Sequence, residues 1–376
     1  MEPLISPGAP LGPDDLARYA RHLSLLPVGA DGQRRLRAAR VLSVGAGGLG
    51  SPVLLYLAAA GVGTLGIIDD DVVDESNLQR QVIHGEPDIG RAKTDSAADA
   101  IGRLNSGVAV VRHTERLTAA NALEIVSGYD LVVDGSDNFA TRYLVNDACA
   151  IAGIPYVWGS ILGFEGQLSV FWQDAPDGRG VTYRDLHPTA PPPGSVPSCA
   201  EAGVLGSLCG VLGSMMATEA LKLIIGIGEP LLGRVLMLDV LSMRLREVEF
   251  RSRGGAPITE IVPEAGDPLA DELPTVDVAE LAGVVAGGAR LIDVREPYEA
   301  EIVQIPGSQL VPLAQFLADP AAYADPAAEI VLYCKSGGRS AQALQAAREA
   351  GLQRVRHLEG GVIEWVERVQ PDARRY

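Results

Sequence analysis

The chain has 376 residues, 47% of them hydrophobic, and a formal net charge of −17. This length predicts two or three domains, and the negative charge disfavours binding to nucleic acid or to an anionic membrane. Four cysteines are too few and too scattered for a disulfide scaffold, so we expect a reducing, cytoplasmic location. The first residues show no basic start followed by an apolar core, so we expect no secretory signal.

Strand and helix patterns alternate through the first two thirds of the chain. Residues 1–13 are expected to be flexible, and Asp14 and Asp15 can cap a helix that runs to about Leu25. We expect strands at 41–44, 64–68, 108–112 and 131–133, with helices at 49–60 and 93–104. This order predicts an α/β, Rossmann-like domain over residues 14–250.

The later part of this domain has a different pattern. Strands at 167–172 and within 235–250 are expected to be antiparallel, which makes the sheet mixed. The apolar stretch at 204–218 is shorter than the ~20 residues that a membrane span needs. We therefore interpret it as a buried helix.

A break in composition separates a second, smaller domain. Residues 251–274 combine Gly, Pro and acidic residues and are predicted to be a linker. Strands are then expected at 291–294, 330–333 and 355–358, with helices between them. Residues 275–376 are thus predicted to form one small α/β domain.

A glycine-rich run, GAGGLG at residues 45–50, stands between a predicted strand and a predicted helix. Such a run lets the backbone approach a phosphate, and the helix N-terminus favours an anion. Asp69 ends the next strand, where it can bind ribose hydroxyls. The alternative is a glycine turn that only packs the helix on the sheet. The predicted nucleotide-binding glycines are Gly45, Gly47, Gly48 and Gly50.

Polar residues beyond the glycine run favour a triphosphate over a dinucleotide. Cations near a phosphate site suit a triphosphate and the charge that develops during displacement. Asp137 and Asn138 follow the strand at 131–133, at the sheet edge where open α/β sheets bind ligands. Asp137 is predicted to hold Mg²⁺. Taken singly, each charged residue among them is better interpreted as a solvated surface group. The other candidates for nucleotide binding are Ser76, Asn77, Arg80 and Lys93.

Together, these segments resemble the MoeB/ThiF family of ubiquitin-activating-enzyme-like adenylyltransferases. The motifs on which this resemblance rests are DESNLQRQVIH at 74–84, the glycine run, SDN at 136–138 and VPSCAEAG at 196–203. The resemblance implies adenylation of the C-terminal Gly-Gly of a ubiquitin-like sulfur carrier by ATP and Mg²⁺. It places Gly48, Asp69, Asn77, Arg80, Lys93 and Asp137 at the ATP-Mg²⁺ site. Arg18 and Arg21 match an arginine motif whose second member reaches the neighbouring subunit's ATP, which implies a homodimer.

The four cysteines receive different interpretations. Cys149 and Cys209 lie in predicted helices and are interpreted as small buried hydrophobic residues. Cys199 follows a Pro-rich stretch and precedes a predicted helix start, where a thiolate is favoured. The family resemblance implies that Cys199 forms a disulfide or thioester link with the carrier or the sulfur donor.

Cys334 ends the strand at 330–333 and begins the loop CKSGGRS. The loop amides and the following helix N-terminus are expected to favour the thiolate or persulfide form of this cysteine. Arg339 is predicted to close the loop with a fixed cation. Four residues separate Cys334 from Arg339, whereas the wider loop of cysteine-dependent phosphatases has five. With LIDVRE at 291–296 and IPGS at 305–308, residues 275–376 resemble a rhodanese domain. Cys334, Cys199, Arg80, Asp137 and Arg339 are the predicted catalytic residues.

One departure from the wider family concerns structural zinc. TYRD at 182–185 stands where many members have a Cys-x-x-Cys pair, and no cysteine follows Phe250 until Cys334. A structural zinc site needs four good ligands, so we expect no zinc. This pattern, with a C-terminal rhodanese domain, most resembles the actinobacterial MoeZ group.

The sequence therefore predicts a sulfur-carrier adenylyltransferase fused to a sulfurtransferase, with thiosulfate or a cysteine desulfurase as sulfur donor. Three alternatives remain open at this point. They are a tRNA-modifying dehydratase of the same superfamily, an NAD-dependent oxidoreductase and a non-catalytic scaffold that binds carriers. The sequence does not name the carrier or its pathway.

Overall fold

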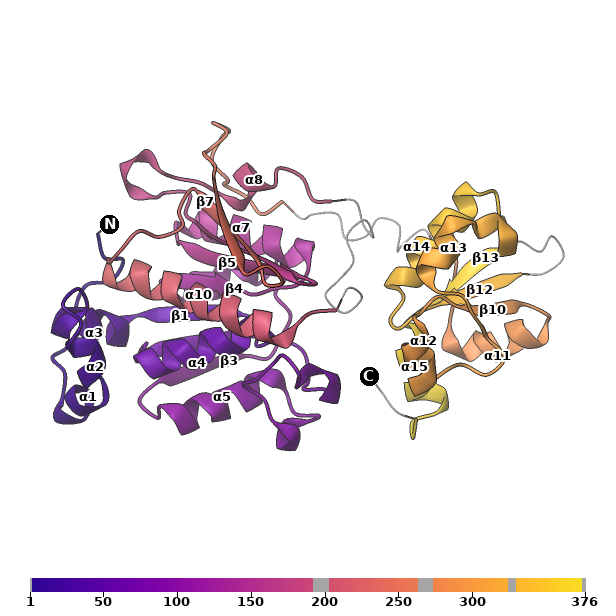
Figure 1. Ribbon diagram of the computed structural model, residues 1–376, viewed down its shortest axis with the longest axis horizontal. Helices are drawn as coiled ribbons and strands as arrows, with labels where there is room; N and C mark the ends of the chain where they lie inside the picture. Colours follow the sequence, from indigo (N-terminus) through magenta and orange to yellow (C-terminus); the bar gives the residue numbers. More distant parts are fainter. Residues whose placement is uncertain (1, 192–202, 263–272, 324–328, 374–376) are drawn as a thin grey trace. The chain divides into compact units, whose positions relative to one another are not determined.

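The computed structural model describes residues 2–191, 203–262, 273–323 and 329–373 (Figure 1). These residues form two compact units, one up to residue 262 and the other from residue 273 onward. Cys199 lies outside the described residues.

The first unit is an α/β domain whose helices and strands largely alternate. Its N-terminal half contains α1 (Pro13–Arg18), α2 (Ala20–Leu23), α3 (Gly29–Ala38), β1 (Arg40–Val44), α4 (Gly50–Ala60), β2 (Thr64–Ile68), η1 (Glu75–Asn77), η2 (Glu86–Asp88), α5 (Lys93–Leu104) and β3 (Ala109–His113). Its second half contains α6 (Ala122–Val126), β4 (Leu131–Asp134), α7 (Phe139–Ala152), β5 (Tyr156–Leu162), β6 (Glu165–Phe171), η3 (Pro176–Gly178), α8 (Tyr183–Leu186), α10 (Gly206–Ile225), β7 (Arg234–Asp239) and β8 (Arg244–Glu249).

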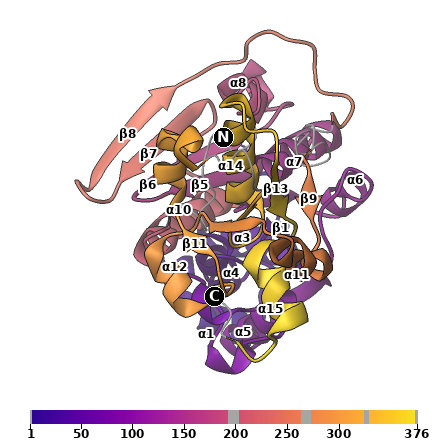
Figure 2. The same ribbon diagram turned by 90° about the vertical axis from the view of Figure 1, so that its right-hand side faces the viewer.

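One mixed sheet organises this unit, in the strand order β3-β2-β1-β4-β5-β6-β7-β8. The strands from β3 to β5 are parallel, and β5 to β8 pair antiparallel. Val41 of β1 lies beside Leu65 of β2 and Leu131 of β4. The chain order therefore reverses at β1, where open α/β sheets bind ligands. The predicted mixed, Rossmann-like fold is confirmed, and β8 forms the outer edge (Figure 2).

Helix α10 belongs to the core of this unit. It is longer than the predicted 204–218 and, among the described residues, is the one helix long and apolar enough to cross a membrane. In the structure α10 packs against α4, α3, β5 and β6, with Leu208, Leu212 and Met216 fully buried. A helix that covers a sheet in this way is the core helix of a globular domain.

The N-terminal helix differs from its prediction. It breaks at Tyr19 (φ −99°, ψ 15°) into α1 and α2, and α3 follows where no helix was predicted. Tyr19 is buried, and its hydroxyl accepts a hydrogen bond from the Asn105 side chain at 2.9 Å. This long-range tertiary contact is invisible to local helix signals, which explains the difference.

Part of the predicted linker is packed on the first unit. The backbone N–H of Arg253 donates to Asp185 at 2.7 Å, and that of Ile258 donates to Gln173 at 2.7 Å. Val262 donates in the same way to the buried Asp147 at 3.2 Å. Residues 251–262 are thus attached to the first unit by side chains that lie far away in the sequence.

The second unit is a smaller sheet in which every described strand pair is parallel. Its elements are β9 (Thr275–Val276), α11 (Val278–Ala286), β10 (Arg290–Asp293), α12 (Pro297–Ile302), β11 (Gln309–Leu310), α13 (Leu313–Ala318), η4 (Pro320–Tyr323), β12 (Ile330–Tyr333), α14 (Gly338–Glu349), β13 (Val355–Leu358) and α15 (Gly361–Val369). The strand order is β11-β10-β12-β13-β9. Two apolar clusters contain alternate residues of the central strand β12, since Ile330 and Leu332 belong to one and Val331 and Tyr333 to the other.

Candidate active sites

The glycine run turns sharply between β1 and α4. Gly45 has φ +90°, a left-handed conformation that glycine adopts without strain. A Cβ atom at Gly50 would lie 2.1 Å from the carbonyl oxygen of Gly45, so this position requires glycine for close packing. A Cβ atom at Gly48 would lie 2.8 Å from the Sγ of Cys209 on α10. The glycine run is therefore closely packed both by its own backbone and by Cys209 of α10.

An open cavity of about 290 Å³ lies beside this turn. Residues that follow β1, β2 and β4 line it, as expected at the carboxyl edge of a parallel sheet. Eight predicted site residues contribute to its lining: Gly45, Gly47, Gly48, Asp69, Arg80, Lys93, Asp137 and Asn138. The structure thus brings together groups that are up to 93 positions apart in the sequence (Gly45 to Asn138).

Four predicted nucleotide-site residues do not line the cavity. Ser76 and Asn77 lie in η1, and the backbone carbonyl of Ser76 accepts a hydrogen bond from Arg80 Nη1 at 3.0 Å. The side chain of Asn77 accepts from the Asp74 backbone N–H at 3.3 Å. Through the Ser76 carbonyl, η1 thus holds the side chain of Arg80, which lines the cavity. Gly50 lies within α4, and Arg21 is exposed on α2.

Asp69, after the end of β2, and Lys93, at the start of α5, already have partners within the chain. The Asp69 carboxylate accepts the backbone N–H groups of Ala46 at 2.8 Å and Asp71 at 2.9 Å. Burial raises the pKa of Asp69, although Lys93 opposes that shift. Lys93 is itself buried, and its Nζ lies 2.7 Å from Asp71 Oδ2. A nucleotide phosphate would therefore compete with Asp71 for Lys93.

Sequence reasoning missed several residues of the cavity. Arg142 is the most notable, because it is 6% exposed and its guanidinium lies 4.9 Å from the Phe139 ring centroid. Its position in the first turn of α7, directly after the predicted Asp137–Asn138 pair, was an available signal. The other missed lining residues with polar side chains are Asp70, Asp71, Gln81, Glu115, Arg116, Ser136, Thr141 and Cys209.

Cys209 and Cys149 are both buried, as expected for small apolar residues. Burial raises the pKa of the Cys149 thiol well above its usual value, which disfavours its thiolate. Cys209 differs because it lines the cavity against Gly48. Its contribution is therefore to the shape of the nucleotide site as well as to the core.

Cys334 lies directly after β12, at the start of the loop that leads into α14. It is 1% exposed. Its Sγ accepts the backbone N–H of Gly337 at 3.1 Å and the hydroxyl of Ser340 at 3.5 Å. Gly337 has φ +110°, a backbone conformation that glycine adopts without strain. Ser340 was not predicted, although its place in the first turn of α14 was a usable signal.

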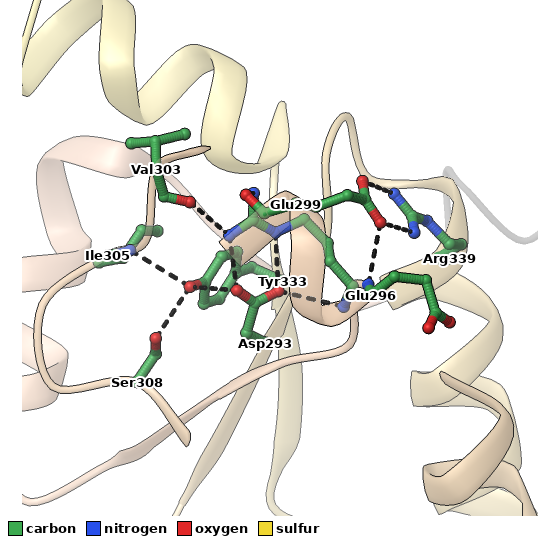
Figure 3. Close-up of polar contacts among 9 residues, drawn as sticks. Asp293, Glu296, Glu299, Val303, Ile305, Ser308, Tyr333 and Arg339 are labelled. Carbon is green, nitrogen blue, oxygen red and sulfur yellow. Dashed lines mark hydrogen bonds and ion pairs between the residues drawn. The ribbon is translucent and has the colours of Figure 1, made fainter. Parts of the chain in front are cut away.

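Arg339 is held in position by a carboxylate of a neighbouring helix. Its guanidinium forms a two-pronged ion pair with Glu299 of α12, with N–O distances of 2.6 and 2.7 Å (Figure 3). Among the described residues, the hydrogen-bond donors to Cys334 Sγ are Gly337 and Ser340, not Arg339. The predicted cation is thus held by a carboxylate that the sequence analysis did not identify.

A buried polar network supports this side of the second unit. Arg295 and Asp293 are both 0% exposed and form an ion pair at 2.6 Å. The Tyr333 hydroxyl donates to Asp293 at 2.8 Å and also contacts Ser308 at 2.9 Å (Figure 3). Burial and the Asp293 carboxylate raise the pKa of Tyr333, so its hydroxyl stays protonated. Such a satisfied network fixes the loops around it.

Comparisons with known proteins agree with this two-part arrangement. The model of the ThiF family matches residues 19–255, and that of the rhodanese-like domain matches residues 277–368. The chain is 52% identical to the probable adenylyltransferase/sulfurtransferase MoeZ of Mycobacterium tuberculosis, over 100% of this chain and 99% of the relative. It is 38% identical to the adenylyltransferase and sulfurtransferase MOCS3 of Mus musculus, over 98% of this chain and 88% of that protein.

Two further similarities concern the first unit. The sulfur carrier protein adenylyltransferase of Thermus thermophilus is 51% identical over 65% of this chain and 91% of its own length. The crystal structure of E. coli MccB with MccA-N7isoASN has a TM-score of 0.57 and 22% identity, covering 65% of this chain and 75% of that chain. At that identity the likeness shows the fold alone. The chain belongs to the ThiF family, and it joins an adenylyltransferase unit of that family to a rhodanese-like sulfurtransferase unit.

Proposed function

We propose that the first unit adenylates the C-terminal Gly-Gly carboxylate of a ubiquitin-like sulfur carrier, and that Cys334 then supplies sulfur to form a thiocarboxylate. The observation that carries this proposal is the occurrence, in one chain, of a cavity with Arg80, Lys93 and Asp137 and of a cysteine held by loop donors. Relatives named as adenylyltransferase and sulfurtransferase support it.

In the adenylation step, a carboxylate oxygen of the carrier attacks the α-phosphorus of ATP. The bond from that phosphorus to the bridging oxygen breaks, and pyrophosphate leaves. Asp69 binds the ribose, while the glycine run approaches the phosphates. Arg80 and Lys93 stabilise the negative charge that grows on the phosphate oxygens. Holding both reactants beside the sheet edge makes the reaction effectively intramolecular.

The cavity offers the oxygen ligands that Mg²⁺ prefers. Asp137 lines it together with Asp69, Asp70 and Asp71, and the last three place their carboxylate oxygens within 4.8 Å of one another. We propose that Asp137 holds Mg²⁺ against the triphosphate. When bound, Mg²⁺ would neutralise phosphate charge and orient the leaving pyrophosphate. We also propose that the protein needs no structural zinc.

In the sulfur steps, the Cys334 thiolate attacks the outer sulfur of thiosulfate, and sulfite leaves with the electron pair of the broken S–S bond. The resulting persulfide attacks the carbonyl carbon of the acyl-adenylate, and AMP leaves. A thiolate, which we assign to Cys199, then attacks Cys334 Sγ and releases the carrier thiocarboxylate. This last step leaves a Cys199–Cys334 disulfide, which a thiol reductant must reduce before the next cycle. A cysteine desulfurase could replace thiosulfate as donor.

Arg21 is exposed on α2, outside the lining of its own chain's cavity. We propose that it reaches the nucleotide of a second copy, so that the enzyme works as a homodimer. The four cysteines and the need for a reduced Cys334 suit the cytoplasm.

The test is carrier-dependent exchange of labelled pyrophosphate into ATP. We expect exchange with at least one carrier that ends in Gly-Gly, and none when the last glycine is removed. Exchange driven by tRNA instead would favour the dehydratase alternative. Absence of exchange with every Gly-Gly carrier would contradict the proposal.

A further inference from the structure

The guanidinium of Arg339 is fully occupied on one side by a carboxylate. Nη1 and Nη2 lie 2.6 and 2.7 Å from the two carboxylate oxygens of Glu299. The side chains are only 10% and 4% exposed. A parallel two-pronged pair of this kind is the strongest arrangement of these two groups. Because both side chains are largely buried, the Glu299 carboxylate compensates the positive charge of Arg339.

Glu299 is itself held in place by hydrogen bonds to its carboxylate and to its backbone carbonyl. Its carboxylate also accepts the backbone N–H of Glu296 at 2.9 Å, which fixes the start of α12 (Figure 3). Arg295 donates to the backbone carbonyls of Val303 at 2.8 Å and Glu299 at 3.4 Å, and is itself paired with Asp293. The carboxylate therefore cannot follow Arg339 if that side chain moves toward another anion.

Among the described residues, the hydrogen-bond donors to Cys334 Sγ are neutral groups. These are the Gly337 N–H at 3.1 Å and the Ser340 hydroxyl at 3.5 Å. Arg339 immediately precedes Ser340 in the first turn of α14, so it is the nearest cation along that helix. An anion site usually combines neutral hydrogen-bond donors with a positive charge. Here the neutral donors contact the sulfur, whereas the positive charge of Arg339 is compensated by Glu299.

We propose that Glu299 is a specificity-determining residue of the sulfur loop, because its pair with Arg339 withholds a full positive charge from anions that enter the loop. The inference rests on the proposed sulfur transfer at Cys334. A thiolate or persulfide carries one negative charge, which neutral N–H and O–H donors can stabilise. A sulfate or phosphate dianion needs a cation in close contact to replace its hydration. The loop thus holds reactive sulfur and binds tetrahedral oxyanions weakly.

The experiment compares three variants of the full-length protein with the wild type. Glu299→Gln keeps the shape and removes the charge that holds Arg339. Glu299→Gln with Arg339→Gln removes both members of the pair. Glu301→Gln is the matched control, because Glu301 lies exposed on the same helix and the same single charge is lost. The probe is inorganic sulfate, and the first readout is its protection of Cys334 from iodoacetamide, followed by peptide mass spectrometry. The second readout is the KM for thiosulfate with cyanide as acceptor.

In Glu299→Gln we expect the sulfate concentration for half-protection to fall about tenfold, the effect of one nearby opposite charge. The thiosulfate KM should fall in the same direction. Glu301→Gln should keep both wild-type values, and the double variant should keep the wild-type half-protection concentration for sulfate. An unchanged half-protection concentration in Glu299→Gln would overturn the proposal. If that variant fails to fold, the double variant decides. Sulfate binding at least tenfold weaker than wild type there would show that Arg339 already lends its charge to anions, contrary to the proposal.

Failure of the proposed function would look different. A wild-type protein whose Cys334 accepts no sulfur from thiosulfate or a persulfide donor would contradict the sulfur step. Sulfate protection does not depend on sulfur transfer, so it would still report on Glu299. Normal sulfur loading with no effect of Glu299→Gln on sulfate would contradict this inference alone.

Discussion

The nucleotide cavity and the sulfur loop use the same local design for opposite purposes. Each follows the carboxyl end of a parallel strand and leads into a helix through a glycine with positive φ, Gly45 in one and Gly337 in the other. The cavity is open and lined by charged groups of both signs. In the sulfur loop, Cys334 and Arg339 are buried, and Arg339 is already paired with Glu299. An open site needs an incoming charged ligand to complete it, whereas a closed site is completed by its own chain.

This difference fits the chemistry proposed for each unit. A triphosphate brings several charges, which the cavity can match only with cations and a metal ion. A persulfide brings one charge on a soft atom, which backbone and hydroxyl donors can stabilise. Variants can therefore separate the two sites.

Cys334→Ala should abolish the closed site and leave the open one intact. We expect no persulfide on the protein and no thiosulfate-dependent thiocarboxylate, because the attacking sulfur is gone. Carrier-dependent pyrophosphate exchange should persist. Loss of exchange in this variant would show that the two sites do not act separately.

Asp137→Ala is the reciprocal test on the open site. We expect pyrophosphate exchange to fall by at least about 100-fold, the usual scale for removing one electrostatic contact to a transition state. Persulfide loading of Cys334, followed by mass spectrometry, should be unchanged. Glu124→Gln, which removes an exposed carboxylate on α6, serves as the control. Exchange retained in Asp137→Ala would remove Asp137 from the Mg²⁺ role.

Gly48→Ala tests how closely the open site is shaped by the core. The new Cβ would lie 2.8 Å from Cys209 Sγ and 3.7 Å from Arg80 Cγ, so either α10 or the glycine run must shift. We expect the KM for ATP to rise about tenfold, a scale typical of a misplaced binding group. Cys209→Ala should partly restore it, since the Cβ of residue 209 would remain at 3.5 Å.

Gly102→Ala on α5 is the control for this substitution, because nothing lies within 4 Å of a Cβ there. We expect it to leave ATP binding unchanged and to stabilise the helix slightly. A Gly48→Ala protein with normal ATP binding, or one that Cys209→Ala makes worse, would contradict the packing account.

His84 should make the first unit sensitive to mild acid. Its Nε2 lies 3.0 Å from the Ala46 carbonyl oxygen and its Nδ1 lies 2.8 Å from the Ser96 hydroxyl. Burial lowers the pKa of His84 below its usual value of 6.5. Protonation of His84 therefore favours the unfolded state. The contribution of neutral His84 to the free energy of unfolding is fully present above about pH 6.5 and is lost as the pH falls below that value.

The measurement for His84 is the free energy of unfolding of the first unit between pH 7.5 and pH 5. We expect His84→Gln to show a shallower decline than the wild type. The slope should not vanish, because burial also lowers the pKa of His187. Equal slopes in the two proteins would show that His84 does not contribute.

Much of the fold followed from local pattern because its parallel strands are short apolar runs. The helix at 93–104 and the strand at 330–333 were predicted with their observed bounds. The strand β5 was missed, and Tyr19 ends a helix early because its ring enters the core. Likewise, residues 251–262 are held by Gln173, Asp147 and Asp185, and their composition alone resembles a linker. Contacts between residues distant in sequence decide these cases.

The candidate sites show the same division. The residues next to the glycine run and after β4 were identified because their chemistry and their place at strand ends coincide. Arg142 was missed because its burial depends on tertiary contacts, although its place directly after Asp137 and Asn138 was an available signal. Glu299 was missed for a related reason, since 40 positions separate it from Arg339. The sequence identified Arg339 as a fixed cation of the loop but not the carboxylate that holds it.

The packing of α10 on α4 also has a consequence for synthesis. Cys209 of α10 supports Gly48, which lies 161 positions earlier in the chain (from 48 to 209). A nascent chain that ends before α10 contains every predicted phosphate-binding residue, yet its glycine run lacks that support. We therefore expect the ability to bind ATP to arise late in translation, after α10 has left the ribosome. The second unit, whose described residues begin at 273, then emerges behind an N-terminal unit that can already be folded.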